Sequence, residues 1–245
     1  MLSAASYRKY LDFYCKPDID TTSKKPFLNV TEIYHPFIKN PVCNSLSTDK
    51  PVLITGSNAS GKSTFIKTLA INAILSQTIY TCLCERYSSS RLKVYSSMSL
   101  RDNLFSQDSY YMAEIKSLKR IVDADKDDIP VICFVDEVLR GTNTLERVAA
   151  SAQILDNLGK QNTLCFAATH DIELTNILKK TYACYHFEEN VIDDDVVFDY
   201  KLKEGPSNTR NAIKLLSVIG YDKNIIKKAE DMTVKFINDG IWDVI

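Results

Sequence analysis

The 245-residue sequence predicts an α/β fold with a mostly parallel central sheet flanked by helices and a smaller antiparallel strand portion. Three observations support this prediction. Short apolar runs alternate along the chain with segments whose apolar residues recur at helical spacing. The apolar runs are continuous, as in residues 131–135, which is typical of strands buried on both faces of a parallel sheet. One such run leads into a G-x-x-x-x-G-K-[ST] pattern and then a helix, the arrangement of P-loop NTPases.

The individual elements follow from local patterns. Residues 5–16 have the spacing of an amphipathic helix, and 16–26 form a polar linker that ends at a proline. Strands are expected over 27–33, 51–55, 92–96, 131–135, 164–168, 182–187 and 196–202. The last of these alternates as an edge or antiparallel strand does. Helices are expected over 62–79, 109–122, 145–158 and 222–238.

We therefore divide the chain into three parts. Residues 1–26 are expected to be the end of a lead-in helix plus a linker, 27–220 the main domain, and 221–245 a C-terminal helix. Because the chain opens on what reads as the end of a helix, we expect the natural protein to be longer.

Composition narrows the function classes. Charged residues make up 25% and hydrophobic residues 45%, as in ordinary soluble domains, and the net charge is −1. Without an overall basic charge, affinity for nucleic acid would need a local patch or another domain. Neither a signal peptide nor a membrane span is visible, because polar residues interrupt the longest apolar stretch, 65–84. We expect a cytoplasmic protein without a membrane partner.

The seven cysteines are odd in number, and several lie inside apolar runs. This pattern favours buried, reduced thiols over a disulfide framework. Cys82-x-Cys84 would suit half of a metal site, but no second Cys/His pair follows at the spacing that zinc requires.

The strongest motif is the loop that follows residues 51–55. Its two glycines let the backbone wrap a phosphate with successive N–H groups pointing inward, and the helix start adds its positive dipole end. Lys62 supplies a point charge for the β- and γ-phosphates of a nucleotide, and the Ser63 hydroxyl suits Mg²⁺. The expected nucleotide-binding residues are Gly56, Ser57, Asn58, Ala59, Ser60, Gly61, Lys62, Ser63 and Thr64.

Two further predicted strands end in residues that are suited to metal binding or catalysis. Asp136 and Glu137 end the run 131–135, and the carboxyl ends of parallel strands are where such sheets bind ligands. Asp136 suits the carboxylate on the Mg²⁺ side, and Glu137 a group that orients or deprotonates the attacking water. His170 ends the next apolar run and suits contact with the γ-phosphate or a water. The alternatives are an acidic strand end facing solvent and a structural histidine.

These motifs, in this order, resemble the C-terminal ATPase domain of the MutS family of mismatch-repair proteins, an ABC-type ATPase. The loop 56–64 looks like the family's G-P-N-M-G-G-K-S-T, and D-E-V-L-R-G-T-N-T at 136–144 looks like its D-E-I-G-R-G-T-S-T. A-T-H at 168–170 matches, and S-Y-Y-M-A-E at 109–114 is similar to S-T-F-M-V-E. The resemblance covers roughly residues 27–230.

The resemblance implies two ATPase domains packed head to tail. Ser109 is then expected to contact the γ-phosphate bound by the other protomer. Gly141, Thr142 and Asn143 are expected to cross the dimer interface, which the C-terminal helix would help to stabilise. Phe37 and Tyr200 match the positions that hold the adenine in the family, although either residue could equally belong to the core.

The resulting hypothesis is a Mg²⁺-dependent ATPase that binds ATP and ADP and works as a homodimer with composite sites. Catalysis would rest on Lys62, Glu137 and His170, coupled in the full protein to DNA repair or recombination. An alternative is a nucleotide-gated dimerisation module with little hydrolysis, because bulky Gln107 and acidic Asp108 replace small residues of the family. Another ABC-type machine would be expected to carry L-S-G-G-Q, which does not occur. For this stretch of chain alone, we expect DNA binding to be weak or absent.

Overall fold

The computed structural model describes residues 3–57, 59–98, 110–124, 128–140, 142–192, 195–207 and 212–242. The chain forms two compact units. The first unit comprises Met1–Phe187 and Tyr200–Ser207, and the second comprises Glu188–Asp199 and Asn208–Ile245.

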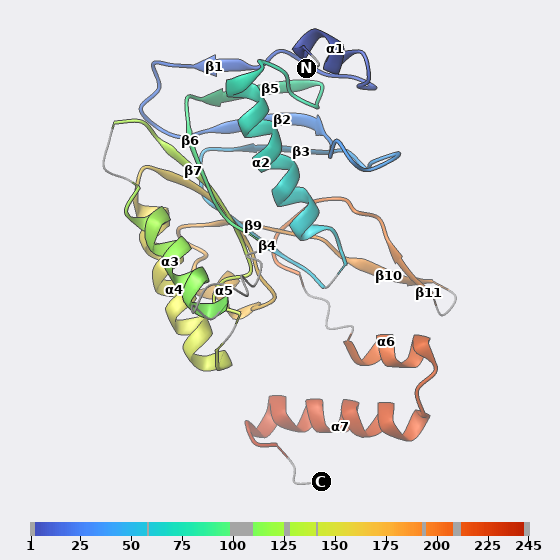
Figure 1. Cartoon of the computed structure of the whole chain (residues 1–245). Coiled ribbons are helices and arrows are strands. Elements are labelled where there is room, and N and C mark those ends of the chain that lie inside the picture. The colour runs from blue at the N-terminus through green and yellow to red at the C-terminus, as the bar shows by residue number, and fades with distance from the viewer. Residues whose placement is uncertain are drawn as a thin grey trace. The chain divides into compact units, whose positions relative to one another are not determined.

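A six-stranded sheet forms the centre of the first unit (Figure 1). Its strands are β4 (Val52–Thr55), β6 (Lys93–Ser97), β7 (Val131–Asp136), β8 (Thr163–Ala168), β9 (Ala183–His186) and β12 (Lys203–Glu204). In the order β12-β9-β4-β8-β7-β6, all neighbours are parallel except β12, which runs antiparallel to β9. The predicted α/β class and mostly parallel sheet are confirmed, and the assignment to P-loop NTPases stays a prediction.

A second, four-stranded sheet was largely missed by the sequence analysis. It contains β1 (Asp18–Asp20), β2 (Leu28–Ile33), β3 (Asn44–Thr48) and β5 (Arg86–Ser90) in the order β1-β5-β2-β3. Of these four strands only β2 was predicted. The strands β3 and β5 are rich in serine, so their sequences lack the apolar run by which the other strands were recognised.

Helix α2 (Lys62–Thr78) packs between the two sheets. One core cluster joins its residues Ile66 and Leu69 to Val30 of β2 and Phe134 of β7. Because α2 is covered on both sides, its buried residues are not confined to one stripe.

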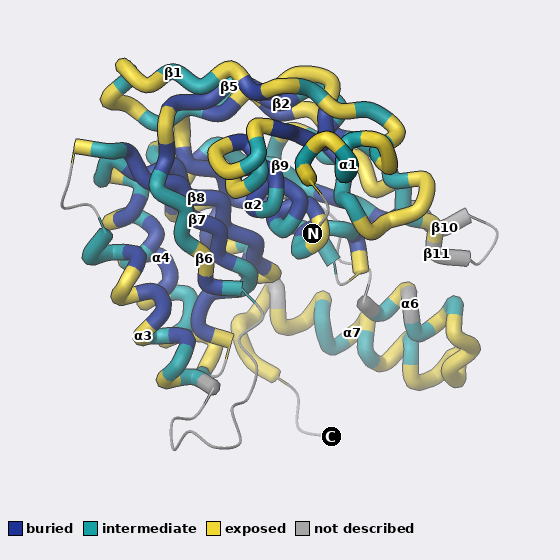
Figure 2. The backbone as a smooth tube through the Cα atoms, turned by 45° about the horizontal axis from the view of Figure 1, so that its top comes forward, coloured by how far each residue is buried: buried dark blue, intermediate teal, exposed yellow. Residues whose placement is uncertain are grey.

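The opposite face of the six-stranded sheet is covered by α3 (Tyr110–Val122), α4 (Thr144–Lys160) and α5 (Glu173–Ile177). Successive residues of β7 point to opposite faces. Phe134 belongs to the cluster around α2, whereas Cys133 and Val135 pack with residues of α3 and α4. Strands β7 and β8 are therefore buried almost throughout, as Figure 2 shows. This burial explains their uninterrupted apolar sequences.

The prediction of a helix over 5–16 is wrong beyond Arg8. Helix α1 covers only Ala4–Arg8. Further along, Cys15 pairs with Cys82, each backbone N–H donating to the other's carbonyl at 2.9 and 3.0 Å. The Arg8 guanidinium also donates to the carbonyl oxygens of Ile79 and Tyr80, at the end of α2. The pairing of Cys15 with Cys82 is incompatible with a helix that continues to residue 16.

The second unit contains the antiparallel pair β10 (Glu189–Ile192) and β11 (Asp195–Phe198), and the helices α6 (Ala212–Ile219) and α7 (Lys223–Asp239). Helix α7 confirms the predicted C-terminal helix. Asp222 caps its first turn, and Gly240 ends it in the left-handed conformation. The strand predicted over 196–202 is wrong in extent, because β11 ends at Phe198. Among the described helices, none is long and apolar enough to cross a membrane.

Candidate functional site

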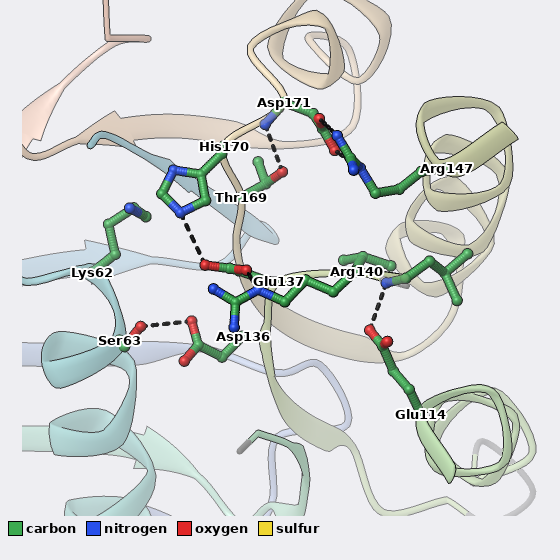
Figure 3. A network of polar contacts seen from close by, with 12 residues as sticks. Lys62, Ser63, Glu114, Asp136, Glu137, Arg140, Arg147, Thr169, His170 and Asp171 are labelled. Carbon is green, nitrogen blue, oxygen red and sulfur yellow. Dashed lines mark hydrogen bonds and ion pairs between the residues drawn. The ribbon is translucent and has the colours of Figure 1, made fainter. Parts of the chain in front are cut away.

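The residues predicted to bind phosphate, hold a metal or activate water converge at the carboxyl ends of three adjacent strands, β4, β8 and β7 (Figure 3). They are Lys62, Ser63, Asp136, Glu137 and His170. Backbone hydrogen bonds continue beyond the strand ends. The N–H of Thr169 donates to the Ile54 carbonyl at 3.0 Å, and that of Glu137 donates to the Ala168 carbonyl at 3.0 Å. Since β8 lies between the other two strands, His170 is placed between the loop 56–64 and the acidic pair.

The loop 56–64 needs its two glycines. Gly56 has a φ of 142°, and a Cβ there would lie 2.4 Å from the carbonyl oxygen of Phe187. Gly61 has a φ of 111°, and a Cβ there would lie 3.3 Å from the ring of Tyr200. Other residues would be strained at both positions. Helix α2 begins at Lys62, inside this loop, so its first N–H groups belong to the same site.

Lys62 is a buried cation, 5% exposed. Its Nζ donates to the carbonyl oxygens of Gly56 at 2.7 Å and Ser57 at 2.6 Å, so the loop itself solvates the charge. The hydroxyl of Ser60 lies in the same loop, fully buried, and has no hydrogen-bond partner among the described residues. A buried hydroxyl of this kind favours a ligand that supplies the missing contact.

The structure brings the two predicted metal ligands together. The Ser63 hydroxyl donates to Oδ1 of Asp136 at 2.8 Å, between the start of α2 and the end of β7. Hydroxyl and carboxylate oxygens are the ligands that Mg²⁺ prefers. In the described part of the chain, no cluster of three or more His, Cys, Asp or Glu side chains is placed to hold a metal ion.

Glu137 lies at the centre of the site, 13% exposed at its side chain. Its Oε1 accepts from Nε2 of His170 at 2.9 Å, and its Oε2 is ion-paired with Nε of Arg140. Burial and the nearby charge of Lys62 lower the pKa of His170 below its usual value. This shift favours the neutral form of the ring, which is hydrogen-bonded to the Glu137 carboxylate through Nε2.

The segment after Glu137 is held by a residue that the sequence analysis did not single out. Glu114 of α3 is 3% exposed, and its Oε1 accepts from the backbone N–H of Leu139 at 2.5 Å. The buried face of this helix contains Glu114, Leu118 and Ile121, and this spacing would have identified the carboxylate.

His170 also has a second support that sequence reasoning missed. The next residue, Asp171, accepts two hydrogen bonds from the Arg147 guanidinium of α4, at 2.9 Å from Nε and 2.6 Å from a terminal nitrogen. The backbone N–H of Asp171 donates to the Thr169 hydroxyl at 3.0 Å. These contacts fix the turn that carries His170.

A cavity of about 580 Å³ opens beside the loop 56–64. Its walls include Lys62, Ser63, Glu137 and Tyr200, but of the predicted adenine-binding pair only Tyr200 is among the lining residues. Phe37 is 88% exposed, while its neighbour Ile38 lines the cavity. The assignment of Phe37 and Tyr200 to adenine stays a prediction.

Three predicted residues, Asn58, Ser109 and Gly141, lie outside the described residues. Of the remaining loop residues, Asn143 caps α4 by accepting from the backbone N–H of Leu145 at 2.9 Å. The Thr142 hydroxyl donates to Glu146 at 3.4 Å. The role of Thr142 and Asn143 at a dimer interface stays a prediction.

Comparison with known proteins gives consistent matches. The MutS domain V family matches residues 52–237. The DNA mismatch repair protein MutS of Finegoldia magna is 28% identical over 235 residues, covering 91% of this chain and 27% of that protein. MutS protein homolog 4 of Homo sapiens is 26% identical over 259 residues, covering 96% of this chain and 26% of that protein. The chain thus spans about a quarter of the length of these relatives.

Proposed function

The chain belongs to the MutS domain V family, and we propose that it binds Mg²⁺–ATP in the cavity beside the loop 56–64 and hydrolyses it. The observation that carries this proposal is the convergence of three strand ends beside the loop 56–64. Lys62, Ser63 and Glu137 line the cavity there. Ser63 is hydrogen-bonded to Asp136, and Glu137 is hydrogen-bonded to His170. These groups suit phosphate binding, metal binding and water activation, respectively.

Binding would rely on the loop and the start of α2. The triphosphate would replace the carbonyl oxygens of Gly56 and Ser57 as the acceptor for Lys62 Nζ, and it would also offer an acceptor to the orphaned Ser60 hydroxyl. Ser63 and Asp136 would hold Mg²⁺, which when bound neutralises charge on the phosphate oxygens. The donor set fits, since both groups supply hard oxygen ligands.

Hydrolysis would be general base catalysis. A water oxygen attacks the γ-phosphorus, a water proton passes to a carboxylate oxygen of Glu137, and the bond from the γ-phosphorus to the bridging oxygen breaks. His170 would hold this carboxylate through its Nε2 contact. Because the Glu137 side chain is mostly buried, its carboxylate would be poorly hydrated.

The longer relatives suggest the wider role. The relatives in Finegoldia magna and Natronomonas pharaonis are both named as DNA mismatch repair proteins. We therefore propose that this domain works in a DNA repair or recombination protein, as a head-to-tail homodimer. Ser109 would then complete the partner's site, with Gly141, Thr142 and Asn143 at the interface.

A test is steady-state ATP hydrolysis with Mg²⁺ over a wide range of protein concentration. Specific activity is expected to rise with concentration, because each site needs a second protomer. Glu137→Gln is expected to lower the rate by roughly 100-fold or more while ATP binding is retained. The exposed Glu85→Gln is the matched control. Hydrolysis by Glu137→Gln at the parent rate would sink the proposal.

A second candidate is a nucleotide-gated dimerisation module with little turnover. It is favoured by one observation: both carboxylate oxygens of Glu137 are already engaged. Dimerisation that depends on ATP, in a protein whose basal rate does not depend on Glu137, would support this candidate.

A further inference from the structure

The carboxylate that we assign as the general base is engaged on both sides. His170 donates to Oε1 of Glu137, and the guanidinium of Arg140 pairs with Oε2 (Figure 3). This pairing occupies one of the oxygens that an attacking water would use. This arrangement is therefore unfavourable for hydrolysis.

The pairing depends on an unusual backbone. Glu137 has a φ of 60° and Leu139 a φ of 57°, although neither is a glycine. Left-handed residues of this kind persist only where surrounding contacts enforce them. These two left-handed residues fold the chain back, so that the Arg140 side chain reaches the side chain of Glu137, three residues earlier.

The contact that enforces this backbone comes from Glu114 on α3. Its buried Oε1 accepts the Leu139 N–H, while its Oε2 is buried without a hydrogen-bond partner among the described residues. Burial raises the pKa of Glu114, and the N–H groups of Leu139 and Arg140 lower it in part. A half-satisfied buried carboxylate is costly for stability alone, which favours a positioning role over a purely structural one.

The ion pair itself is weak enough to open. The Arg140 side chain is 59% exposed, and ion pairs with one solvated partner contribute little. Its partner Glu137 is 13% exposed and keeps the His170 contact when Arg140 leaves. Opening would thus free one oxygen of Glu137 without disturbing its other support.

We propose that Arg140 is a gate on Glu137 and that Glu114 is the residue that positions this gate. The inference rests on the proposed ATP hydrolysis and adds its regulation. In the closed state Arg140 holds Oε2. In the open state that oxygen accepts the proton of the attacking water. Because Glu114 belongs to α3, whose first residue follows Ser109, a shift of this helix at a protomer contact would move the gate.

The test compares kcat for ATP and the dissociation constant for ATP in the full chain and its variants. Arg140→Gln removes the cation, and it is expected to raise kcat roughly threefold to tenfold with ATP affinity changed less than about twofold. The matched control is Lys160→Gln, which removes one positive charge from an exposed pair with Asp156 and is expected to leave kcat unchanged. An unchanged or lower kcat in Arg140→Gln overturns the gate.

Glu114 gives a second, independent measurement. Glu114→Ala removes the acceptor for the Leu139 N–H and is expected to raise kcat as Arg140→Gln does. Glu114→Gln keeps an acceptor oxygen and is expected to stay closer to the parent. If both Glu114 variants equal the parent, Glu114 does not position the gate. If Glu114→Ala does not fold, the glutamine variant and Arg140→Gln decide.

The outcomes also separate the gate from the proposed function. If the parent hydrolyses ATP through Glu137 and Arg140→Gln gains nothing, only the gate fails. If neither protein shows hydrolysis that depends on Glu137, the proposed hydrolysis fails and the gate fails with it.

Discussion

The two loops that form the site are built in different ways. The loop 56–64 is determined by its own residues, because glycines at Gly56 and Gly61 allow its path and Lys62 donates to carbonyls five and six residues back. The loop after β7 is determined by distant residues. Glu114 holds Leu139 from α3, and His170 contacts Glu137 from the end of β8.

This difference separates recognition from control. A loop built from nearby residues keeps its shape wherever the strand and helix around it are kept, which suits a constant ligand such as a phosphate. A loop held by side chains from two other elements changes when either element moves. We infer that the first loop binds and the second responds.

The largest expected effect is the loss of ATP affinity in Lys62→Ala. This variant removes a buried cation that would donate to the phosphates, so affinity is expected to fall roughly 100-fold. Titration with a fluorescent ATP analogue measures it. Lys119→Ala, which removes an exposed lysine of α3, is the control. Equal affinity of the two variants would mean that the loop does not bind phosphate through Lys62.

The next effect concerns the backbone of the first loop. In Gly56→Ala the new methyl group would meet the Phe187 carbonyl oxygen, so we expect the free energy of unfolding to fall by about 2–4 kcal/mol. Gly205→Ala is a matched control, since Gly205 also has a positive φ but nothing lies within 4 Å of its Cβ position. Its expected loss is about 1 kcal/mol, from conformation alone. Urea unfolding of both variants measures how much stability is lost to the close contact with Phe187 rather than to backbone conformation. Equal losses in the two variants would contradict a role for that contact.

A smaller loss of stability is expected when Arg147 no longer holds Asp171, the residue next to His170. Arg147→Ala leaves the mostly buried Asp171 without its two hydrogen bonds, and we expect a loss of about 1–2 kcal/mol in the free energy of unfolding. Arg147→Lys keeps the charge but not the paired geometry, so its loss is expected to be intermediate. Lys160→Ala breaks an exposed ion pair of the same helix and should cost less. A loss in Lys160→Ala as large as in Arg147→Ala would contradict this account.

The smallest effect is a pH dependence from His170. Its pKa is lowered in the folded protein, so the unfolded chain binds the proton more readily. The neutral ring therefore contributes stability above the usual pKa of histidine, and this contribution is lost as the pH falls through that value. His170→Gln is expected to lose less stability than the parent between pH 8 and pH values below about 6. Parallel unfolding curves would contradict the lowered pKa.

Sequence patterns predicted one part of the fold well. Residues 131–135 and 164–168 lie in strands because buried strands need uninterrupted apolar residues, and that requirement is local. The strand Asn44–Thr48 was missed because its polar residues are held by pairing with β2, which no local pattern reveals. The helix expected over 5–16 is wrong beyond Arg8 for the same reason, because Cys15 pairs with the distant Cys82.

The same distinction between local and distant determinants applies to the residues of the site. Lys62, Ser63 and Asp136 were predicted because the motif and the strand ends place them together. Arg147 was missed because its partner, Asp171, lies on a different element. Glu114 had a usable signal, because it recurs at helical spacing with the buried residues Leu118 and Ile121.

Helix α2 has a mechanical consequence for the protein. At one end it starts from the loop that holds Lys62, and at the other the Arg8 guanidinium and the Cys15–Cys82 pairing tie it to the N-terminal segment. Its 17 residues make a straight rod of about 25 Å. A displacement of the N-terminal segment would therefore be expected to move the far end of this helix, and with it Lys62 and Ser63.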